Sequence, residues 1–178
     1  MQCPNTTKSR LPVIHIVGLP GAGKTTLGKK LSKEFGMPVF KIGRYRSMFP
    51  VSEVGEADAW LLLFKNLSKQ RWENCILETT GLNSRECFLR AAFPFPNVVT
   101  IKLVAQRKVL YERIRMKKKS ERGGDWLFSA DFRDKFEFAR KMFGQFKNIP
   151  AEITIDTSHK TAQGVFRKAV SGLKLWAP

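Results

Sequence analysis

The chain has 178 residues, which is the size of one ordinary domain built around one hydrophobic core. Hydrophobic residues make up 43% of it and charged residues 26%, a balance typical of a globular protein rather than a disordered one. No apolar run approaches the roughly 18 residues that a membrane-spanning helix requires, so a transmembrane protein is excluded. We therefore expect residues 1–178 to form a single domain.

The N-terminus and the cysteines indicate the compartment. The first ten residues, MQCPNTTKSR, lack the apolar core of a secretory signal, so we expect the protein in the cytoplasm. Cys3, Cys75 and Cys87 are few, odd in number and without metal-ligand spacing, which predicts reduced thiols. The oligomeric state stays open, with a monomer favoured.

The charge of the chain is its most unusual property. There are 32 Lys and Arg residues against 15 Asp and Glu residues, for a formal net charge of +17 at pH 7. Such an imbalance predicts a polyanionic partner, with nucleic acid ahead of an acidic membrane surface. The alternative is a basic surface that serves only solubility. The excess is spread through the domain, because residues 102–122 hold nine basic and two acidic residues while residues 51–101 hold five and six.

Short apolar, β-branched runs alternate with helical patterns along the chain. The runs predict strands at residues 12–17, 37–42, 75–78, 97–104 and 151–155. Apolar spacing predicts helices at residues 27–35, 54–70, 106–117 and 161–173. The first of these helices is expected to stop at Gly36. Strands that alternate with helices predict an α/β fold with a five-stranded parallel sheet and helices on both faces.

A glycine-rich loop lies between the first predicted strand and the first predicted helix. It matches the Walker A pattern GxxxxGK[ST] at every defined position, with Gly18, Pro20, Gly21, Ala22, Gly23, Lys24, Thr25 and the following Thr26. Glycines allow the loop to turn its backbone N–H groups toward a phosphate. The lysine is then placed to reach the β and γ phosphates of ATP, and the threonine hydroxyl to complete a Mg²⁺ shell. A plain turn is the alternative, which the lysine, threonine, strand and helix together disfavour.

A carboxylate ends the third predicted strand. Glu78 follows Cys75, Ile76 and Leu77, where a Walker B type acid lies beside the first strand. There it is suited to accept a hydrogen bond from Mg²⁺-bound water or to take the proton of an acceptor hydroxyl. The alternative is a carboxylate that caps the next helix or faces solvent.

A dense basic stretch follows the fourth predicted strand. Its members are Arg107, Lys108, Arg113, Arg115, Lys117, Lys118, Lys119 and Arg122. In a phosphoryl-transfer enzyme a mobile, arginine-bearing lid closes over ATP and stabilises charge on the transferred group. We predict such a lid at about residues 113–129, with Arg113 and Lys117 on one helix face. A solvated charged helix is the alternative for any single residue.

Candidates for acceptor binding are fewer. Arg44, Tyr45 and Arg46 follow the second predicted strand, at the sheet edge where α/β proteins bind ligands. Trp126, beyond the lid, is suited to stack on a base. Aromatic residues are more often part of the core, which is the alternative for Tyr45 and Trp126. His15 lies inside the first strand and is interpreted as a core histidine.

The segments GLPGAGKTT, ILETTGLNSRE, VLYERIRMK and IDTS together resemble the P-loop kinases of the nucleoside-monophosphate, shikimate and polynucleotide kinase group. The resemblance implies a three-layer P-loop NTPase fold with a basic lid, ATP and Mg²⁺ as cofactors, and adenine contacts from Asp156, Thr157 and His159. Phage kinases that phosphorylate 5-hydroxymethyluracil in DNA look closest in kind. Many members place an aspartate just after the second strand, whereas this chain has Gly43 and Arg44 there. Either Glu78 takes the role of the base, or an acid of the following helix does, namely Glu53, Glu56 or Asp58.

These observations predict a kinase that transfers the γ-phosphoryl group of ATP to a hydroxyl on DNA or a nucleotide. The leading hypothesis is the hydroxymethyl group of 5-hydroxymethyluracil in phage DNA, which places the protein in the host cytoplasm. The first alternative is a nucleoside-monophosphate or other small-molecule kinase. The second alternative is a nucleic-acid-binding module in which ATP acts as a switch.

Overall fold

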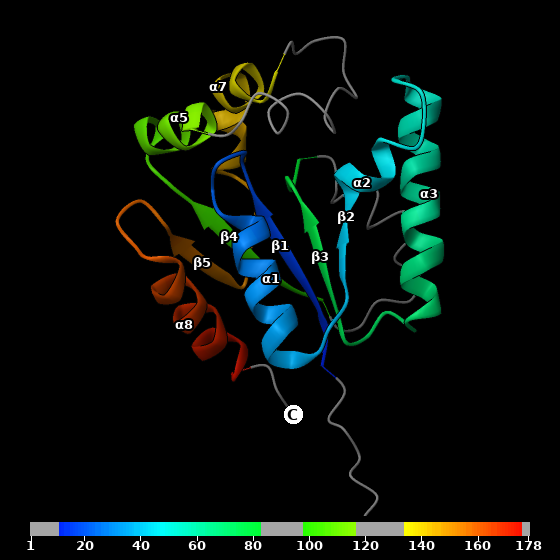
Figure 1. Cartoon of the computed structure of the whole chain (residues 1–178), viewed down its shortest axis with the longest axis horizontal. Helices are drawn as coiled ribbons and strands as arrows, with labels where there is room; N and C mark the ends of the chain where they lie inside the picture. Colours follow the sequence, from blue (N-terminus) through cyan, green and yellow to red (C-terminus); the bar gives the residue numbers. More distant parts are fainter. Residues whose placement is uncertain (1–10, 83–97, 117–133, 176–178) are drawn as a thin grey trace, which may run out of the picture.

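The computed structural model describes residues 11–82, 98–116 and 134–175, which form a sheet flanked by helices (Figure 1). The strands are β1 (Val13–Gly18), β2 (Val39–Lys41), β3 (Cys75–Thr79), β4 (Val98–Val104) and β5 (Ile153–Asp156). The helices are α1 (Lys24–Phe35), α2 (Ile42–Arg46), α3 (Glu53–Lys69), α5 (Arg107–Met116), α7 (Lys135–Phe146) and α8 (Ala162–Leu173). Within these residues, no helix is both long enough and apolar enough to cross a membrane.

The five strands form one parallel sheet in the order β2-β3-β1-β4-β5. The strand β1 lies at its centre, with Ile16 paired to Glu78 of β3 on one side and to Ile101 of β4 on the other. All carboxyl ends therefore meet at one edge, where parallel α/β sheets place their ligands. This confirms the predicted α/β class and the five-stranded parallel sheet.

Helix boundaries follow local chemistry. Helix α1 begins after Gly23, whose φ of 98° is a conformation that favours glycine, and it ends at Gly36 with a φ of 67°. The side chain of Ser52 accepts a hydrogen bond from the backbone N–H of Gly55 and so caps α3. Asp134 caps α7 in the same way, by accepting from the N–H groups of Phe136 and Glu137.

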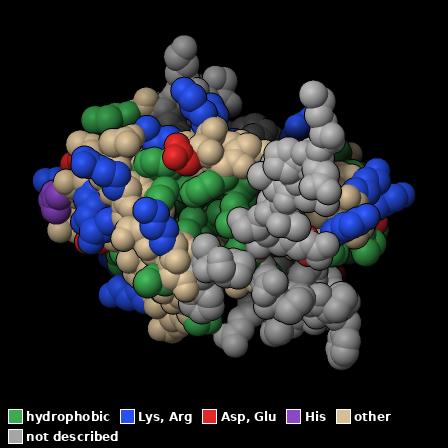
Figure 2. Space-filling view, turned by 90° about the horizontal axis from the view of Figure 1, so that it is seen from below, with side chains coloured by type: hydrophobic (Ala, Val, Ile, Leu, Met, Phe, Trp, Pro, Cys, Tyr) green, Lys and Arg blue, Asp and Glu red, His purple; other side chains and the backbone are tan. Residues whose placement is uncertain are grey.

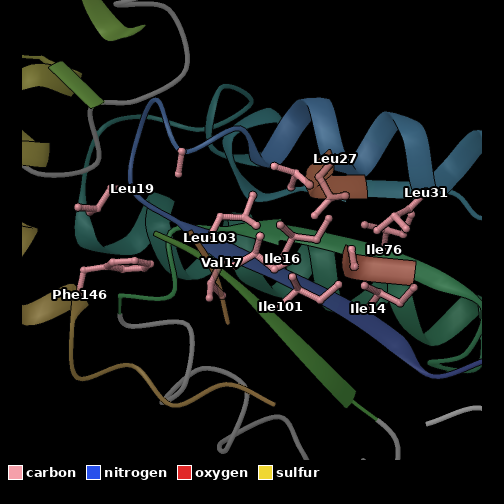
Figure 3. Packing of buried hydrophobic residues seen from close by; sticks show 14 of the residues in the cluster. Ile14, Ile16, Val17, Leu19, Leu27, Leu31, Ile76, Ile101, Leu103 and Phe146 are labelled. Atoms are coloured by element: carbon pink, nitrogen blue, oxygen red, sulfur yellow. The ribbon is translucent and has the colours of Figure 1, made fainter. Parts of the chain in front are cut away.

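Two hydrophobic clusters hold the layers together. The larger one joins buried side chains of β1 and β4 to α1, α5, α7 and α8, and Figure 3 shows Ile14, Ile16, Leu27 and Leu103 packed within it. The smaller one packs Ile42 and Tyr45 of α2 and the inner face of α3 against β3. Burial of apolar surface on both sides of β1 stabilises the sheet edge that carries the glycine loop.

The structure differs from the prediction mainly after β2. The strand predicted at residues 37–42 is shorter, at Val39–Lys41, and Ile42–Arg46 form the helix α2, for which no helix was predicted. Residues 135–146 form α7, which agrees with the helical spacing of their aromatic side chains. Cys75 is a free thiol buried in β3, where burial raises its pKa to about 12. Cys3 and Cys87 lie outside the described residues.

Candidate active site

The glycine loop is the best defined part of the site. It runs from the end of β1 into α1, and the N–H of Ala22 donates to the carbonyl of Leu19 at 3.1 Å. Gly21 has a φ of +84°, and a Cβ added there would lie 2.8 Å from the carbonyl oxygen of Leu110 on α5. Both facts require glycine at this position, because a side chain is strained by the first and blocked by the second. The loop is therefore packed directly against α5.

Lys24 folds back over the loop that precedes it. Its Nζ donates to the carbonyl oxygens of Gly18 at 2.7 Å and Leu19 at 3.3 Å. The side chain is partly buried and lines a cavity at the carboxyl edge of the sheet. A lysine held in this way carries a positive charge at the position that the loop offers to phosphate.

Thr25, in the first turn of α1, lies beside Glu78 of β3. The Oγ1 of Thr25 donates to Oε1 of Glu78 at 2.7 Å. Oε2 of Glu78 is buried and has no hydrogen-bond partner among the described residues, and Lys41 Nζ lies 3.9 Å from it. A hydroxyl beside a buried carboxylate oxygen without a partner fits Mg²⁺, which prefers oxygen ligands. No group of three or more His, Cys, Asp or Glu residues gathers within the described part, so phosphate oxygens and water would have to supply the other ligands.

Arg113 connects three elements around the loop. Its guanidinium donates to Oγ1 of Thr157 at 3.0 Å and to the carbonyl of Thr157 at 2.7 Å. A third, longer contact of 3.5 Å reaches the carbonyl of Gly21. Arg113 therefore lies on α5 and is anchored to the segment after β5. Residues 113–116 of the predicted lid belong to this helix, and residues 117–129, which include Lys117 and Trp126, lie outside the described residues.

The glycine loop forms one wall of a cavity of about 730 Å³. The other walls come from the ends of β2 and β3, from α2, and from the start of α8. The charged residues that line it are Lys24, Lys41, Arg44, Arg46, Glu78, Arg113, Lys135 and Lys160. Glu78 is thus the one carboxylate among the described lining residues, and the cavity is suited to anionic ligands.

The three candidates on α2 point in different directions. Arg44 is exposed at the cavity, and its guanidinium has no hydrogen-bond or ion-pair partner among the described residues. Arg46 also lines the cavity, but its guanidinium donates twice to Glu56, whose Oε1 also accepts from Trp60 Nε1 at 2.8 Å. Tyr45 is only 7% exposed and packs in the smaller cluster, so the expected acceptor contact is replaced by a core position. A short helix turns consecutive side chains to different sides, which explains the difference.

A buried polar pair lies beneath the site. Nε2 of His15 and Oγ1 of Thr79 are 2.8 Å apart, and Oγ1 also accepts from the N–H of Gly81 at 3.0 Å. Burial lowers the pKa of His15 to about 3, so the ring is neutral at physiological pH. The interpretation of His15 as a core histidine agrees with this. The pair holds the turn that directly follows Glu78.

The residues after β5 are only partly at the cavity. Thr157 lines it, whereas Asp156 and His159 are not among its lining residues. Asp156 accepts from the N–H and the hydroxyl of Ser158, which lowers its pKa, and His159 is exposed with Nε2 3.3 Å from Nε2 of Gln106. The geometry therefore gives these two predicted adenine contacts no place at the cavity wall.

Several lining residues are absent from the predicted set. Thr79 and Thr80 follow Glu78 in the segment CILETTG, and Lys41 ends β2. These residues lie at the ends of predicted strands, so their position at the ligand-binding edge of the sheet could have been predicted. Lys135, Lys160, Ala162 and Val165 reach the cavity only through the packing of α7 and α8, for which no local pattern exists.

The fold and the site together define a P-loop nucleotide-binding protein. A model of the family described as AAA domain matches residues 14–135, which is more than half of the chain. The protein therefore belongs to the AAA domain family. A search of curated proteins found no match.

Solved structures of kinases share the fold. Shikimate kinase from Acinetobacter baumannii is 16% identical, with a TM-score of 0.62 over 93% of this chain and 94% of that one. Gluconokinase from Sinorhizobium meliloti 1021 is 17% identical, with a TM-score of 0.60 over 93% of both chains. Thymidylate kinase from Candida albicans is 17% identical, with a TM-score of 0.61 over 95% and 93%. The chain thus has the three-layer fold of P-loop kinases, as predicted, while none of these structures supports a relation to phage DNA kinases.

Proposed function

We propose that the protein is an ATP- and Mg²⁺-dependent kinase whose acceptor is a small molecule with a negative charge. The observation that carries this proposal is one cavity with two different walls. Lys24, Thr25 and Glu78 line one wall, the donor wall, which is suited to phosphate and Mg²⁺. Arg44 and Lys41, whose Nζ lies 3.9 Å from Oε2 of Glu78, line a second, cationic wall, the acceptor wall. A donor and an acceptor bound against these walls would meet between them.

On the donor wall, each residue has a distinct part. The N–H groups of the glycine loop and the start of α1 would bind phosphate oxygens. Lys24 would exchange its carbonyl partners for the γ-phosphate, and Arg113 would stay anchored by Thr157 while it faces the nucleotide. Thr25 and Glu78 would hold Mg²⁺, which supplies neutralisation of the charge that develops on the transferred group.

The nature of the acceptor follows from the acid and base groups available. Glu78 is the one carboxylate among the described lining residues, and it is already bonded to Thr25. A hydroxyl acceptor would have to give its proton to Oε2 of Glu78, whereas a phosphate acceptor is ionised at neutral pH and needs no base. Arg44 stands where many P-loop kinases have an aspartate, so an acceptor that brings its own negative charge fits this wall.

A nucleic-acid acceptor is the second candidate, including 5-hydroxymethyluracil in DNA. The observation that favours it is the net charge of +17, which exceeds what ATP and one small anion require. The similar solved structures described above are named for small-molecule kinases, which is why we place this candidate second.

A single assay separates the candidates. Labelled ATP and Mg²⁺ are supplied with nucleoside monophosphates, shikimate, gluconate, plain DNA, 5-hydroxymethyluracil DNA or 5′-hydroxyl DNA ends, and the label in each acceptor is counted. We expect label in one class of anionic small molecule. Label on DNA alone would establish the second candidate, and no transfer to any acceptor while ATP still binds would contradict a kinase.

Salt provides an independent check on the acceptor. Each phosphate contact of a polymer adds about −0.9 to the slope of log K against log salt concentration. We therefore expect the KM of a small acceptor to change little between 50 and about 200 mM salt. A steep rise in KM over this range would favour the polymer.

A further inference from the structure

The helices α1 and α8 lie side by side on the sheet (Figure 1) and share a basic surface. Lys30 joins them, since its Nζ donates to Oε1 of Gln163 at 2.9 Å and lies 5.9 Å from the centre of the Phe166 ring. We define the α1–α8 surface by its basic side chains, which are Lys29, Lys30, Lys33, Lys160, Arg167, Lys168 and Lys174. All of these except Lys30 and Lys160 are exposed.

Little of the positive charge of this surface is neutralised within the described residues, although Asp156 lies near Lys160. Glu34 is the one acidic residue from Lys24 to Phe35, and residues 157–175 contain none. Among the described residues, no basic side chain of the α1–α8 surface forms an ion pair with a carboxylate. The helix α3 is different, because Glu53, Glu56 and Asp58 balance its Lys65 and Lys69. On the face seen from below, Figure 2 shows more Lys and Arg than Asp and Glu side chains.

We infer that the α1–α8 surface is a docking surface for nucleic acid. The two helices have 12 residues each, or about 18 Å at 1.5 Å per residue. This length spans about five phosphates of a B-DNA strand, at 3.4 Å per phosphate. The surface also reaches the cavity, because Lys160, Ala162 and Val165 line it. A bound strand would therefore pass the mouth of the active site.

An anionic membrane is the other polyanion to consider, and the surface does not suit it. Helices that bind membranes insert exposed apolar side chains between the headgroups. The exposed large hydrophobic residues of the described chain are Met48, Val51, Val54, Leu61, Met116 and Leu175. Leu175, next to Lys174, is the one member of this set near the surface, and the other five lie on other elements, so the surface offers one exposed apolar side chain rather than an inserting face.

The test uses the full-length protein and a fluorescently labelled DNA duplex of 20 base pairs, with anisotropy measured across a salt titration. The variant Lys29→Gln/Lys33→Gln/Arg167→Gln removes three exposed charges from the α1–α8 surface. The matched control, Lys65→Gln/Lys69→Gln/Arg71→Gln, removes three exposed charges at the end of α3. None of the six residues lines the cavity.

We expect the α1–α8 variant to bind the duplex at least about tenfold more weakly at low salt. Its slope of log K against log salt should be shallower by two to three, since each lost contact removes about 0.9. The control should stay within about twofold of the wild type. Equal weakening by both variants, no binding by the wild type, or binding only to vesicles with about 30% phosphatidylserine would overturn the proposal.

This inference does not rest on the proposed function. Label transfer from ATP to a small acceptor is measured on the same three proteins, and we expect equal rates. Absence of duplex binding by the wild type, with intact label transfer, would contradict only the docking surface. Intact duplex binding without label transfer to any acceptor would contradict only the proposed kinase activity.

Discussion

The two walls of the cavity hold their cations in different ways. On the donor wall, Lys24 and Arg113 each donate to a backbone carbonyl at 2.7 Å. On the acceptor wall, Arg44 is exposed and has no such partner among the described residues. The donor wall is thus organised before its ligand arrives, whereas the partner of Arg44 would have to come with the acceptor.

The neighbour of Arg44 explains how the acceptor wall keeps its shape. Arg46 is fixed by Glu56, and Glu56 also accepts from Trp60, so α2 is tied to α3. A pair with side-chain exposures of 13% and 27% is partly protected from solvent, which favours a structural role for Arg46. The contrast teaches that one arginine of α2 serves the fold and the other is available for recognition.

The largest effect is expected for Lys24→Ala, which tests the donor wall. The change removes the charge that would stabilise the transferred phosphoryl group, so kcat for label transfer should fall by about 10²-fold or more. Folding should persist, because the hydrogen bonds of the side chain to Gly18 and Leu19 stay within its own loop. Circular dichroism and single-turnover transfer measure the two. Wild-type transfer by this variant would contradict the assignment of the donor wall.

Glu78→Gln tests the carboxylate that contacts Thr25 and lies near Lys41. The amide keeps the size of the side chain but loses the negative charge beside Thr25, so turnover should fall by at least about tenfold. The Mg²⁺ concentration for half-maximal rate should rise as well, which distinguishes a metal role from that of a base alone. Near-normal turnover would contradict both roles of Glu78, since none of the acids of α3 lines the cavity.

Arg44→Ala tests the acceptor wall alone. Loss of one charge-assisted hydrogen bond should raise the KM of the acceptor by about tenfold and leave the KM of ATP unchanged. Arg71→Ala, an exposed arginine beyond α3, is the matched control and should change neither constant. A higher KM for ATP with an unchanged KM for the acceptor would reverse the assignment of the two walls.

The donor wall was largely predictable from sequence, because its residues are contiguous. The pattern from Gly18 to Thr25 contains the whole loop, and the alternation of strands and helices places it at the end of the central strand. Glu78 was also predictable, since it ends the strand next to β1. The close approach of Gly21 to Leu110 was not, because it depends on how α5 packs.

The acceptor wall and the far end of the cavity depend on contacts between distant segments. The sequence predicts Tyr45 beside the acceptor, but the five-residue helix α2 turns it into the core and leaves Arg44 outside. Lys160 reaches the cavity from the loop that precedes α8, more than a hundred residues from the glycine loop. No short-range sequence pattern encodes such contacts. The predicted acceptor contact of Tyr45 was therefore wrong, and the position of Lys160 at the cavity was not predicted.

The smallest effect concerns the pair beneath both walls, His15 and Thr79. The folded chain holds His15 at a pKa of about 3, whereas the ordinary value is 6.5. The unfolded chain therefore takes up a proton as pH falls below 6.5, and the folded chain does not until about pH 3. The contribution of the neutral ring to the free energy of unfolding is fully present above pH 6.5. Below that pH it decreases by up to about 1.4 kcal/mol per pH unit.

Urea unfolding at pH 7.5, 6 and 5 measures this slope. The variant His15→Gln should be about 1 kcal/mol less stable at pH 7.5, because it loses the hydrogen bond to Thr79. Its free energy of unfolding should then fall less steeply with acid than that of the wild type. Thr79 also accepts a hydrogen bond from the N–H of Gly81 in the turn after Glu78. If the variant alters turnover, we expect the KM of ATP and the KM of the acceptor to change by the same factor. Equal pH slopes in the two proteins would show that His15 is not held neutral by the fold.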